Sequence, residues 1–244
     1  MKICLITDIH IDAPGELPIG LDTRLQFVQT IQKIKEKKYD FMIVAGDLCH
    51  KTGIKETYLW IKSQLNETSI PYCVIPGNHD TSPVLAEVFG LDGELFDEEL
   101  YYDRKFVDGN VIFLDTSKGM MSDTQFKWLE EKIESSPETV TICMHHPPLI
   151  SHSNHMEPTY MFSQMERFEN LCSKYLGKKF QIFCGHYHME RTIIKNNITL
   201  FITPSTFVQI DPDSFEFRKL GDSFGYREIW ITEGQCYYTN VIYI

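Results

Sequence analysis

The sequence predicts an α/β fold built from stacked strand–helix units. In the first part of the chain, short apolar runs of strand length alternate with amphipathic stretches of helical length. Such alternation is typical of buried, largely parallel strands with covering helices. Beyond about residue 190 the helical stretches end and strand-like runs follow one another. The 244 residues, 43% of them hydrophobic, contain no linker-like or repetitive tract, so one domain over 1–244 is expected.

The first ranges alternate strictly between the two element types. Apolar runs predict strands at residues 3–7, 41–45 and 70–75. Helices are predicted at residues 23–38, 54–66 and 84–89. The first of these helices carries apolar residues at helical spacing, namely Leu25, Val28, Ile31 and Ile34. This order predicts three successive βα units.

The rest of the chain begins with a predicted hairpin, residues 100–107 and 111–115, around Asp108-Gly109-Asn110. A helix is predicted from Ser122, with Asp123 in its first turn, to about residue 134. A strand at 139–144, a helix at 159–176 and a strand at 181–184 follow. The remaining predicted strands are 192–194, 200–202, 226–231 and 236–244, so the part from about 200 to 244 is strand-rich.

Polar clusters follow five of these predicted strands directly. In order they are Asp8-Ile9-His10, Gly46-Asp47, Gly77-Asn78-His79-Asp80, His145-His146 and Gly185-His186-Tyr187-His188. Any one of them, taken alone, is also explained as a turn, a cap or a surface pair. In open α/β sheets, however, ligands bind at the carboxyl ends of the strands. Five such clusters on strand ends therefore favour a common site.

The side chains of these clusters indicate a metal site. The candidate ligands are Asp8, His10, Asp47, Asn78, His145, His186 and His188. Imidazoles, carboxylates and an amide oxygen without a thiolate suit Fe, Mn, Zn, Co or Ni. Seven ligands exceed what one tetrahedral ion needs and suit two ions about 3.5–4 Å apart that share a carboxylate. Such a pair binds a phosphate and acidifies water, so hydrolysis of a phosphate ester is expected.

As a set and in their order, the five blocks resemble the calcineurin-like metallophosphoesterase superfamily. The resemblance implies a four-layer α/β/β/α sandwich with two mixed β-sheets. It also implies two divalent metal ions. The ligands that it implies for the first ion are Asp8, His10, Asp47 and His188. Those for the second ion are Asp47, Asn78, His145 and His186, with Asp47 bridging and His145 preferred to His146.

The same resemblance implies catalytic and substrate-binding residues. His79 is expected to face the substrate phosphate, together with Asn78, as a general acid or as a transition-state stabiliser. Asp80 is expected to orient His79 or to cap the turn. His152 and His155 follow the Pro-Pro turn and are candidate substrate contacts, with solvated loop histidines as the alternative.

A second resemblance narrows the substrate. Three runs are similar to bacterial class III cyclic-nucleotide phosphodiesterases, with glycerophosphodiesterases as close relatives: residues 144–148, Thr203-Pro204-Ser205-Thr206 with Gln209, and Gly225-Tyr226-Arg227. The resemblance implies hydrolysis of 3′,5′-cyclic nucleotides, such as cyclic AMP, to 5′-monophosphates. The alternatives are a glycerophosphodiesterase and a broad phosphodiesterase or phosphomonoesterase. A metal-free scaffold or binding module is disfavoured, because none of the seven ligands is missing.

Composition excludes other classes of protein. A formal net charge of −11 disfavours binding to nucleic acid. Residues 48–50 read Leu-Cys-His, whereas protein phosphatases of the superfamily carry Arg-Gly there. No apolar run reaches the roughly 18 residues of a membrane helix, and no signal peptide is recognised, so a cytoplasmic location is expected.

The seven cysteines are expected as buried thiols. The aromatic tail at 237–243 is a candidate homodimer contact, with packing on its own sheet as the alternative.

Overall fold

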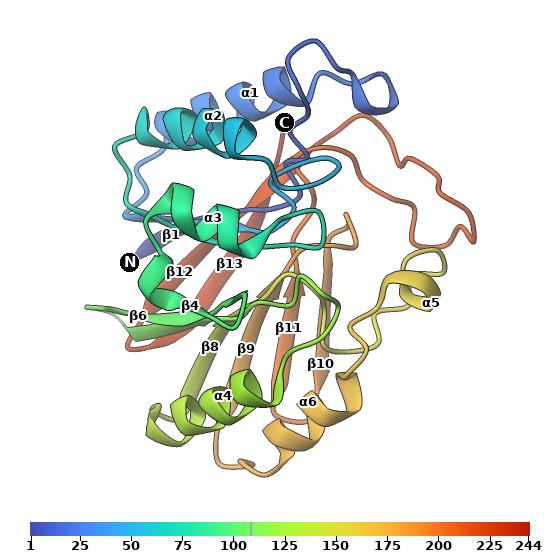
Figure 1. Ribbon diagram of the computed structural model, residues 1–244. Coiled ribbons are helices and arrows are strands. Elements are labelled where there is room, and N and C mark those ends of the chain that lie inside the picture. The colour runs from blue at the N-terminus through green and yellow to red at the C-terminus, as the bar shows by residue number, and fades with distance from the viewer. Residues whose placement is uncertain (108) are drawn as a thin grey trace.

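The computed structural model describes residues 1–107 and 109–244, and the predicted turn residue Asp108 lies outside them. Two β-sheets lie face to face in the middle of the molecule (Figure 1). Helices cover the outer face of each sheet, α1 and α2 on one side and α4 and α6 on the other (Figure 1). The predicted four-layer α/β/β/α sandwich with two mixed sheets is therefore confirmed.

The first sheet combines the βα part of the chain with its C-terminal strands. Its strands are β1 (Lys2–Ile6), β2 (Phe41–Ala45), β3 (Tyr72–Ile75), β12 (Gly225–Thr232) and β13 (Gln235–Tyr243). They lie in the order β13-β12-β1-β2-β3. β1, β2 and β3 run parallel, whereas β12 pairs antiparallel with both β1 and β13. β1 therefore lies in the centre of a mixed sheet.

The second sheet is formed by the middle of the chain. Its strands are β6 (Tyr102–Phe106), β7 (Gly109–Phe113), β8 (Thr139–Cys143), β9 (Lys179–Cys184), β10 (Arg191–Lys195) and β11 (Ile198–Ile202). They lie in the order β10-β11-β9-β8-β7-β6, with antiparallel pairs only at the two edges. A small separate sheet pairs β4 (Leu95–Phe96) with β5 (Glu99–Leu100).

The helices follow the strands they cover. They are α1 (Thr23–Glu36), α2 (Lys55–Asn66), α3 (Ser82–Phe89), α4 (Asp123–Ser135), α5 (Glu157–Tyr160) and α6 (Met165–Ser173), with short 3-10 helices η1 (Pro18–Gly20) and η2 (Asp92–Glu94). Side chains of Asp22 and Ser122 accept hydrogen bonds from the first turns of α1 and α4, which fixes where these helices begin. None of the helices among the described residues is long and apolar enough to cross a membrane.

The central strands are buried on both faces. Every residue of β2 is buried, and so are the last four of β1. A strand covered on both sides needs apolar residues at successive positions, which explains the continuous apolar runs in the sequence. All seven cysteines carry free thiols, and six of them are buried.

One predicted helix is wrong. Residues 159–176 were expected to form one helix, but α5 and α6 are separate. Backbone groups between them have partners elsewhere in the fold: the Tyr160 carbonyl accepts from His186 Nε2 at 2.7 Å, and the Ser163 N–H donates to Gly119 O at 2.9 Å. These long-range bonds replace the bonds that a continuous helix would make.

The predicted buried face of α1 is also partly wrong. Leu25 is 53% exposed, whereas Phe27, Thr30, Ile31 and Ile34 are buried. The ring of Phe27 lies in the hydrophobic core. An aromatic ring buries more apolar surface than a leucine, which favours a helix rotation that buries Phe27 and leaves Leu25 exposed.

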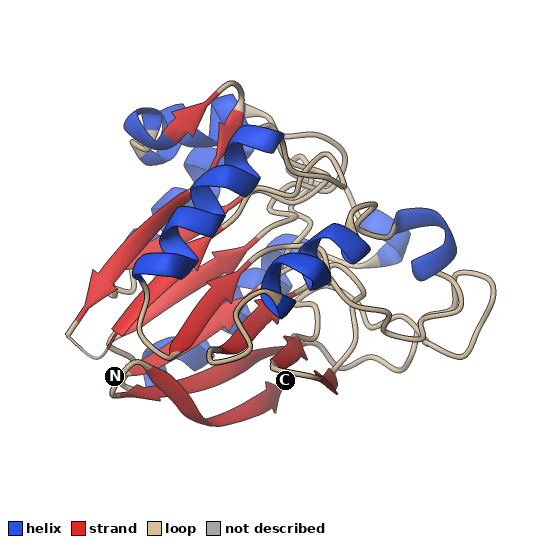
Figure 2. Ribbon diagram, turned by 90° about the horizontal axis from the view of Figure 1, so that it is seen from below, coloured by secondary structure: helices blue, strands red, loops and turns tan. Residues whose placement is uncertain are grey.

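The long loops gather at one end of the two sheets (Figure 2). The carboxyl ends of β1, β2 and β3 point there from the first sheet, and those of β8 and β9 from the second. Residues that lie far apart in the sequence therefore meet at this edge.

Candidate metal centre

Tight turns hold the candidate ligands at the ends of their strands. Five of the seven have left-handed backbone conformations, with φ of 44–68°: Asp8, His10, Asp47, His186 and His188. Such a conformation costs on the order of 1–3 kcal/mol for a non-glycine residue and persists only when the surroundings enforce it. It turns each side chain out of the sheet and toward the common edge. Clustered strain of this kind is typical of functional sites.

Two glycines leave the space that the carboxylates occupy. A Cβ on Gly185 would lie 2.0 Å from Thr7 Oγ1 and 2.4 Å from Asp8 Oδ2. A Cβ on Gly77 would lie 2.3 Å from Asp47 Oδ1. No real side chain tolerates such contacts, so only glycine fits at these two positions.

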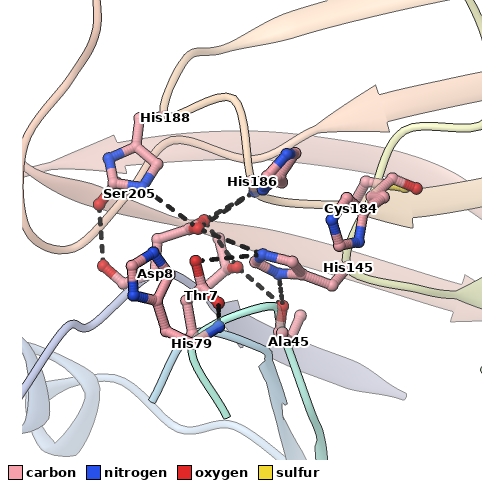
Figure 3. Close-up of polar contacts among 12 residues, drawn as sticks. Thr7, Asp8, Ala45, His79, His145, Cys184, His186, His188 and Ser205 are labelled. Carbon is pink, nitrogen blue, oxygen red and sulfur yellow. Dashed lines mark hydrogen bonds and ion pairs between the residues drawn. The ribbon is translucent and has the colours of Figure 1, made fainter. Parts of the chain in front are cut away.

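The ligand atoms fall into two overlapping groups. In each group all the ligand atoms lie within 4.8 Å of one another; the groups are Asp8, His10, Asp47 and His188, and Asp47, His145 and His186. Asp47 is common to both groups, and its role as a bridging ligand stays a prediction. Figure 3 shows Asp8, His145, His186 and His188 directed toward one another. Asn78 is exposed and lines the same cavity as His186.

Backbone carbonyls fix the tautomers of three histidines. The carbonyl partners, at 2.7–2.9 Å, are Ala45 for Nδ1 of His145, Val208 for Nδ1 of His188 and Tyr160 for Nε2 of His186. A carbonyl oxygen only accepts, so the bonded nitrogen carries the proton. In the neutral ring the other nitrogen presents a lone pair to the centre. Metal-binding histidines are oriented in this way.

The ligand nitrogens and carboxylates lie within a few ångströms of one another. His10 Nε2 lies 3.0 Å from His188 Nε2, and His188 Nε2 lies 3.3 Å from Asp8 Oδ1. His145 Nε2 is buried without a hydrogen-bond partner, 3.3 Å from Asp47 Oδ2. Lone pairs and carboxylates this close repel one another unless a cation or a proton lies between them. The donor set therefore fits divalent cations.

The pKa values agree with this role. Burial lowers the pKa of His10 to about 3, and burial together with His145 lowers the pKa of His186 to about 4. Burial acts to raise the pKa of Asp8, but His188 and His145 outweigh it and hold that pKa at about 2. These groups are thus neutral imidazoles and an ionised carboxylate at neutral pH.

His145 differs from the other imidazoles. Burial acts to lower its pKa, yet Asp47 and Asp8 outweigh burial and raise the pKa to about 9. The carboxylates thus hold a proton on His145 when no metal is bound. A cation meets the same need and displaces that proton, as ligands generally lose protons on metal binding.

His79 and Asp80 have different surroundings. The backbone N–H of His79 donates to Asp47 Oδ1 at 2.9 Å. The half-buried ring of His79 lies edge-on to the ring of His10, with centroids 5.0 Å apart. Asp80 accepts hydrogen bonds from the N–H groups of Leu48, Cys49 and Gly77 and from the hydroxyl of Tyr58. Of the two roles expected for Asp80, this geometry fits capping of the turn.

The two loop histidines lie on segments beside the centre. His155 packs against Tyr160 and Phe217, with ring centroids 6.1 and 6.2 Å apart. His152 is exposed and lines a separate cavity together with Phe215. The structure does not bring either of them into the two ligand groups, and their contact with substrate stays a prediction.

Sequence reasoning missed the partners that hold the ligands in place. Ser205 Oγ donates to the Asp8 carbonyl at 2.9 Å, and Val208 supplies the carbonyl for His188. A backbone carbonyl carries no sequence signal. Ser205 did carry one, since it belongs to the run that resembles cyclic-nucleotide phosphodiesterases, but its role as a support was not expected.

Fold and centre together define a metal-dependent phosphoester hydrolase of the metallophosphoesterase type. Hydrolases of this type use a two-metal centre. The sequence pattern of the calcineurin-like phosphoesterases matches residues 1–190. The chain belongs to this family.

Several bacterial relatives carry names that specify substrates. A probable cyclic nucleotide phosphodiesterase of Fibrobacter succinogenes is 33% identical over 87% of this chain and 82% of its own. A 3′,5′-cyclic-nucleotide phosphodiesterase of a Nostoc species is 27% identical over 93% and 86%. A probable glycerophosphodiester phosphodiesterase of Arcobacter nitrofigilis is 28% identical over 87% and 81%.

Solved structures agree on the fold. A dimetal phosphatase from Danio rerio superimposes with a TM-score of 0.70 over 95% of this chain and 93% of its own, at 13% identity. Purple acid phosphatase from yellow lupin gives 0.64 over 98% of this chain and 53% of its own, at 17% identity. At such identities the likeness concerns the fold alone.

Proposed function

We propose that the protein hydrolyses small phosphodiesters, with 3′,5′-cyclic nucleotides such as cyclic AMP as the main substrates and 5′-monophosphates as products. The observation that carries the proposal is the pair of buried ligand groups that share Asp47 at the edge of the sheets. The names of the Fibrobacter and Nostoc relatives support the choice of cyclic nucleotides.

The two groups suit a diester. Two divalent cations bound there, from among Fe, Mn, Zn, Co and Ni, would supply Lewis acidity for the phosphate oxygens and acidify water. A diester has two free oxygens and one negative charge, which matches two adjacent cations. In the hydrolysis the oxygen of water bonds to phosphorus, the bond from phosphorus to the 3′ oxygen breaks, and that oxygen takes up a proton.

Different residues of the chain bind the cations and act on the substrate. We assign Asp8, His10 and His188 to one cation, Asn78, His145 and His186 to the other, and Asp47 to both. His79 serves as the general acid or stabilises the transition state. Its ring is half-buried beside His10, and the hydrogen bond from its backbone N–H to Asp47 holds the residue in place. Asp80 acts through the turn that carries His79.

The test uses protein loaded with a single kind of divalent metal ion. It compares kcat/KM for cyclic AMP, cyclic GMP, a glycerophosphodiester, bis(p-nitrophenyl) phosphate and p-nitrophenyl phosphate. We expect a cyclic nucleotide to lead the natural esters and bis(p-nitrophenyl) phosphate to be hydrolysed measurably. A monoester that leads by about tenfold or more would contradict the diesterase proposal. If every ester is inert with two metals bound, hydrolysis of small phosphodiesters is excluded.

A glycerophosphodiester is the second candidate substrate. It is favoured by the name of the Arcobacter relative, which is as similar to this chain as the Nostoc relative is. The same comparison decides between them, since only the ranking of the two diesters changes.

The expectations of a single domain, a cytoplasmic location, no nucleic-acid or membrane partner and a homodimer stay predictions.

A further inference from the structure

A cavity of about 350 Å³ opens beside the second ligand group. Asn78 and His186 line it on the side of the metal centre, and His146 lies with them. Ser117 and Lys118 line it from the segment after β7. The size lies within the range of pockets that bind small organic molecules.

The walls of the cavity are held by hydrogen bonds. Buried Asp115 accepts from the Ser117 N–H at 2.8 Å and from Ser82 Oγ at 2.6 Å, which fixes the segment after β7. The opposite wall is the segment after α5, whose Ser163 donates both its N–H and its Oγ hydrogen to Gly119 O, at 2.9 and 3.0 Å. The cavity is therefore formed before any ligand binds.

His146 contributes an imidazole ring to the lining of this cavity. Its side chain is 2% exposed, and its ring lies against that of His186 with centroids 4.1 Å apart. Thr116 Oγ1 accepts from the His146 N–H at 3.2 Å and lies 2.9 Å from Nδ1. Thr116 Oγ1 can donate its hydrogen to Nδ1 or accept one from it, so Nε2 is a donor in one tautomer and an acceptor in the other. In both tautomers Nε2 has no hydrogen-bond partner among the described residues.

Lys118 adds a positive charge to the wall. Its only ion-pair partner among the described residues is Glu98, at 3.6 Å, and its side chain is 56% exposed. A weak surface pair of this kind leaves the ammonium group available. An ammonium group, an imidazole ring nitrogen and a serine hydroxyl around one cavity suit a ligand with hydroxyl groups, which both donate and accept hydrogen bonds.

From this arrangement we infer that the cavity is the subsite for the organic part of the substrate, and that it is built for a sugar or another polyol. The inference rests on the proposed function, because it places the phosphate on the neighbouring ligand groups. His146 and Lys118 are its specificity-determining residues, and neither has been assigned to a metal.

The test is equilibrium binding to metal-loaded protein, measured by calorimetric titration with adenosine 5′-monophosphate and, separately, with inorganic phosphate. His146→Phe keeps a ring against His186 but removes the hydrogen-bonding nitrogens, and Lys118→Ala removes the charge. We expect each variant to bind the nucleotide about five- to tenfold more weakly and to bind phosphate as wild type does. His146→Gln, whose amide can both donate and accept a hydrogen bond, should recover part of the loss.

Lys127→Ala is the matched control, because it removes one exposed lysine of α4 and changes the net charge equally. Nucleotide binding should not change in this variant. Metal content and melting curves are measured for every variant. If His146→Phe loses metal, Lys118→Ala still tests the inference, because Lys118 is exposed and distinct from the candidate metal ligands.

Two results would overturn the inference: unchanged nucleotide binding in Lys118→Ala and His146→Phe, or an equal loss for nucleotide and for phosphate. Binding needs no turnover, so the two proposals fail separately. A protein that binds the nucleotide through this cavity and yet leaves cyclic AMP intact supports the subsite and contradicts the proposed function.

Discussion

At the scale of single residues, the two carboxylates of the centre depend on glycines that make room for them. Gly185→Ala would place a Cβ among Thr7 Oγ1 and Asp8 Oδ2, so Asp8 must move. We expect about 1–3 kcal/mol less free energy of unfolding and a loss of bound metal. Urea unfolding and elemental analysis measure the two effects. Gly177→Ala, with no atom within 4 Å of its Cβ, is the control, and a variant that keeps two metals per chain would contradict the expectation.

His79 allows a test of catalysis apart from metal binding. Its N–H holds Asp47, and this contact survives substitution of the side chain. We expect His79→Ala to retain its metals and its melting temperature while kcat falls about 10²–10⁴-fold. The assay uses a diester with a poor leaving group, for which protonation matters most. Turnover equal to that of wild type on this substrate would exclude the role.

Most of the candidate centre could be predicted from the sequence because side-chain chemistry and strand ends are both visible there. His186 and His188 stand together after an apolar run, and a parallel strand exposes its carboxyl end. What holds them could not be predicted. The carbonyls of Val208 and Tyr160 belong to segments whose path depends on the whole fold.

At the scale of elements, a buried carboxylate on β12 joins β1 to the segment between α1 and β2. Glu228 Oε1 lies 3.1 Å from both Lys2 Nζ and Lys37 Nζ, and the Tyr39 hydroxyl donates to it. Burial acts to raise the pKa of Glu228, but the hydrogen bonds from Tyr39, Lys37 and Lys2 outweigh it and lower the pKa.

This lowered pKa predicts how stability depends on pH. A carboxylate with a lowered folded-state pKa stabilises the fold above its unfolded pKa, about 4.3, and loses that effect as the pH falls through the folded value. Glu228→Gln should thus cost about 1–2 kcal/mol at pH 7 and progressively less below pH 4. Urea unfolding at several pH values measures this. Glu138→Gln, in an exposed pair with Lys179, is the control, and a cost independent of pH would contradict the assignment.

Elements were predictable where local and tertiary preferences agree. β2 is apolar throughout and buried throughout, so its sequence and its environment coincide. The stretch 159–176 is helical by local pattern alone. There the fold draws the Tyr160 carbonyl to His186, and two short helices result.

At the scale of the whole molecule, the centre joins the two sheets. The His186 N–H, after β9 of the second sheet, donates to Asp8, after β1 of the first. Bound cations would relieve the repulsion between Asp8 and Asp47 and stabilise the folded state by mass action. We therefore expect chelated protein to melt at a lower temperature, and Mn²⁺ or Zn²⁺ to restore the loss. Identical melting curves would mean that the cluster binds no metal.

The position of β1 between β2 and β12 has a consequence for synthesis on the ribosome. β1 is made about 220 residues before its antiparallel neighbour, since Leu5 pairs with Arg227. At about 5–20 residues per second, one edge of this apolar strand waits on the order of ten to forty seconds for its partner. Ser205 and Val208, which support Asp8 and His188, also emerge late. The apolar edge of β1 therefore stays without its β12 partner until Arg227 has been made, and Asp8 and His188 gain these supports only after Val208 has been made.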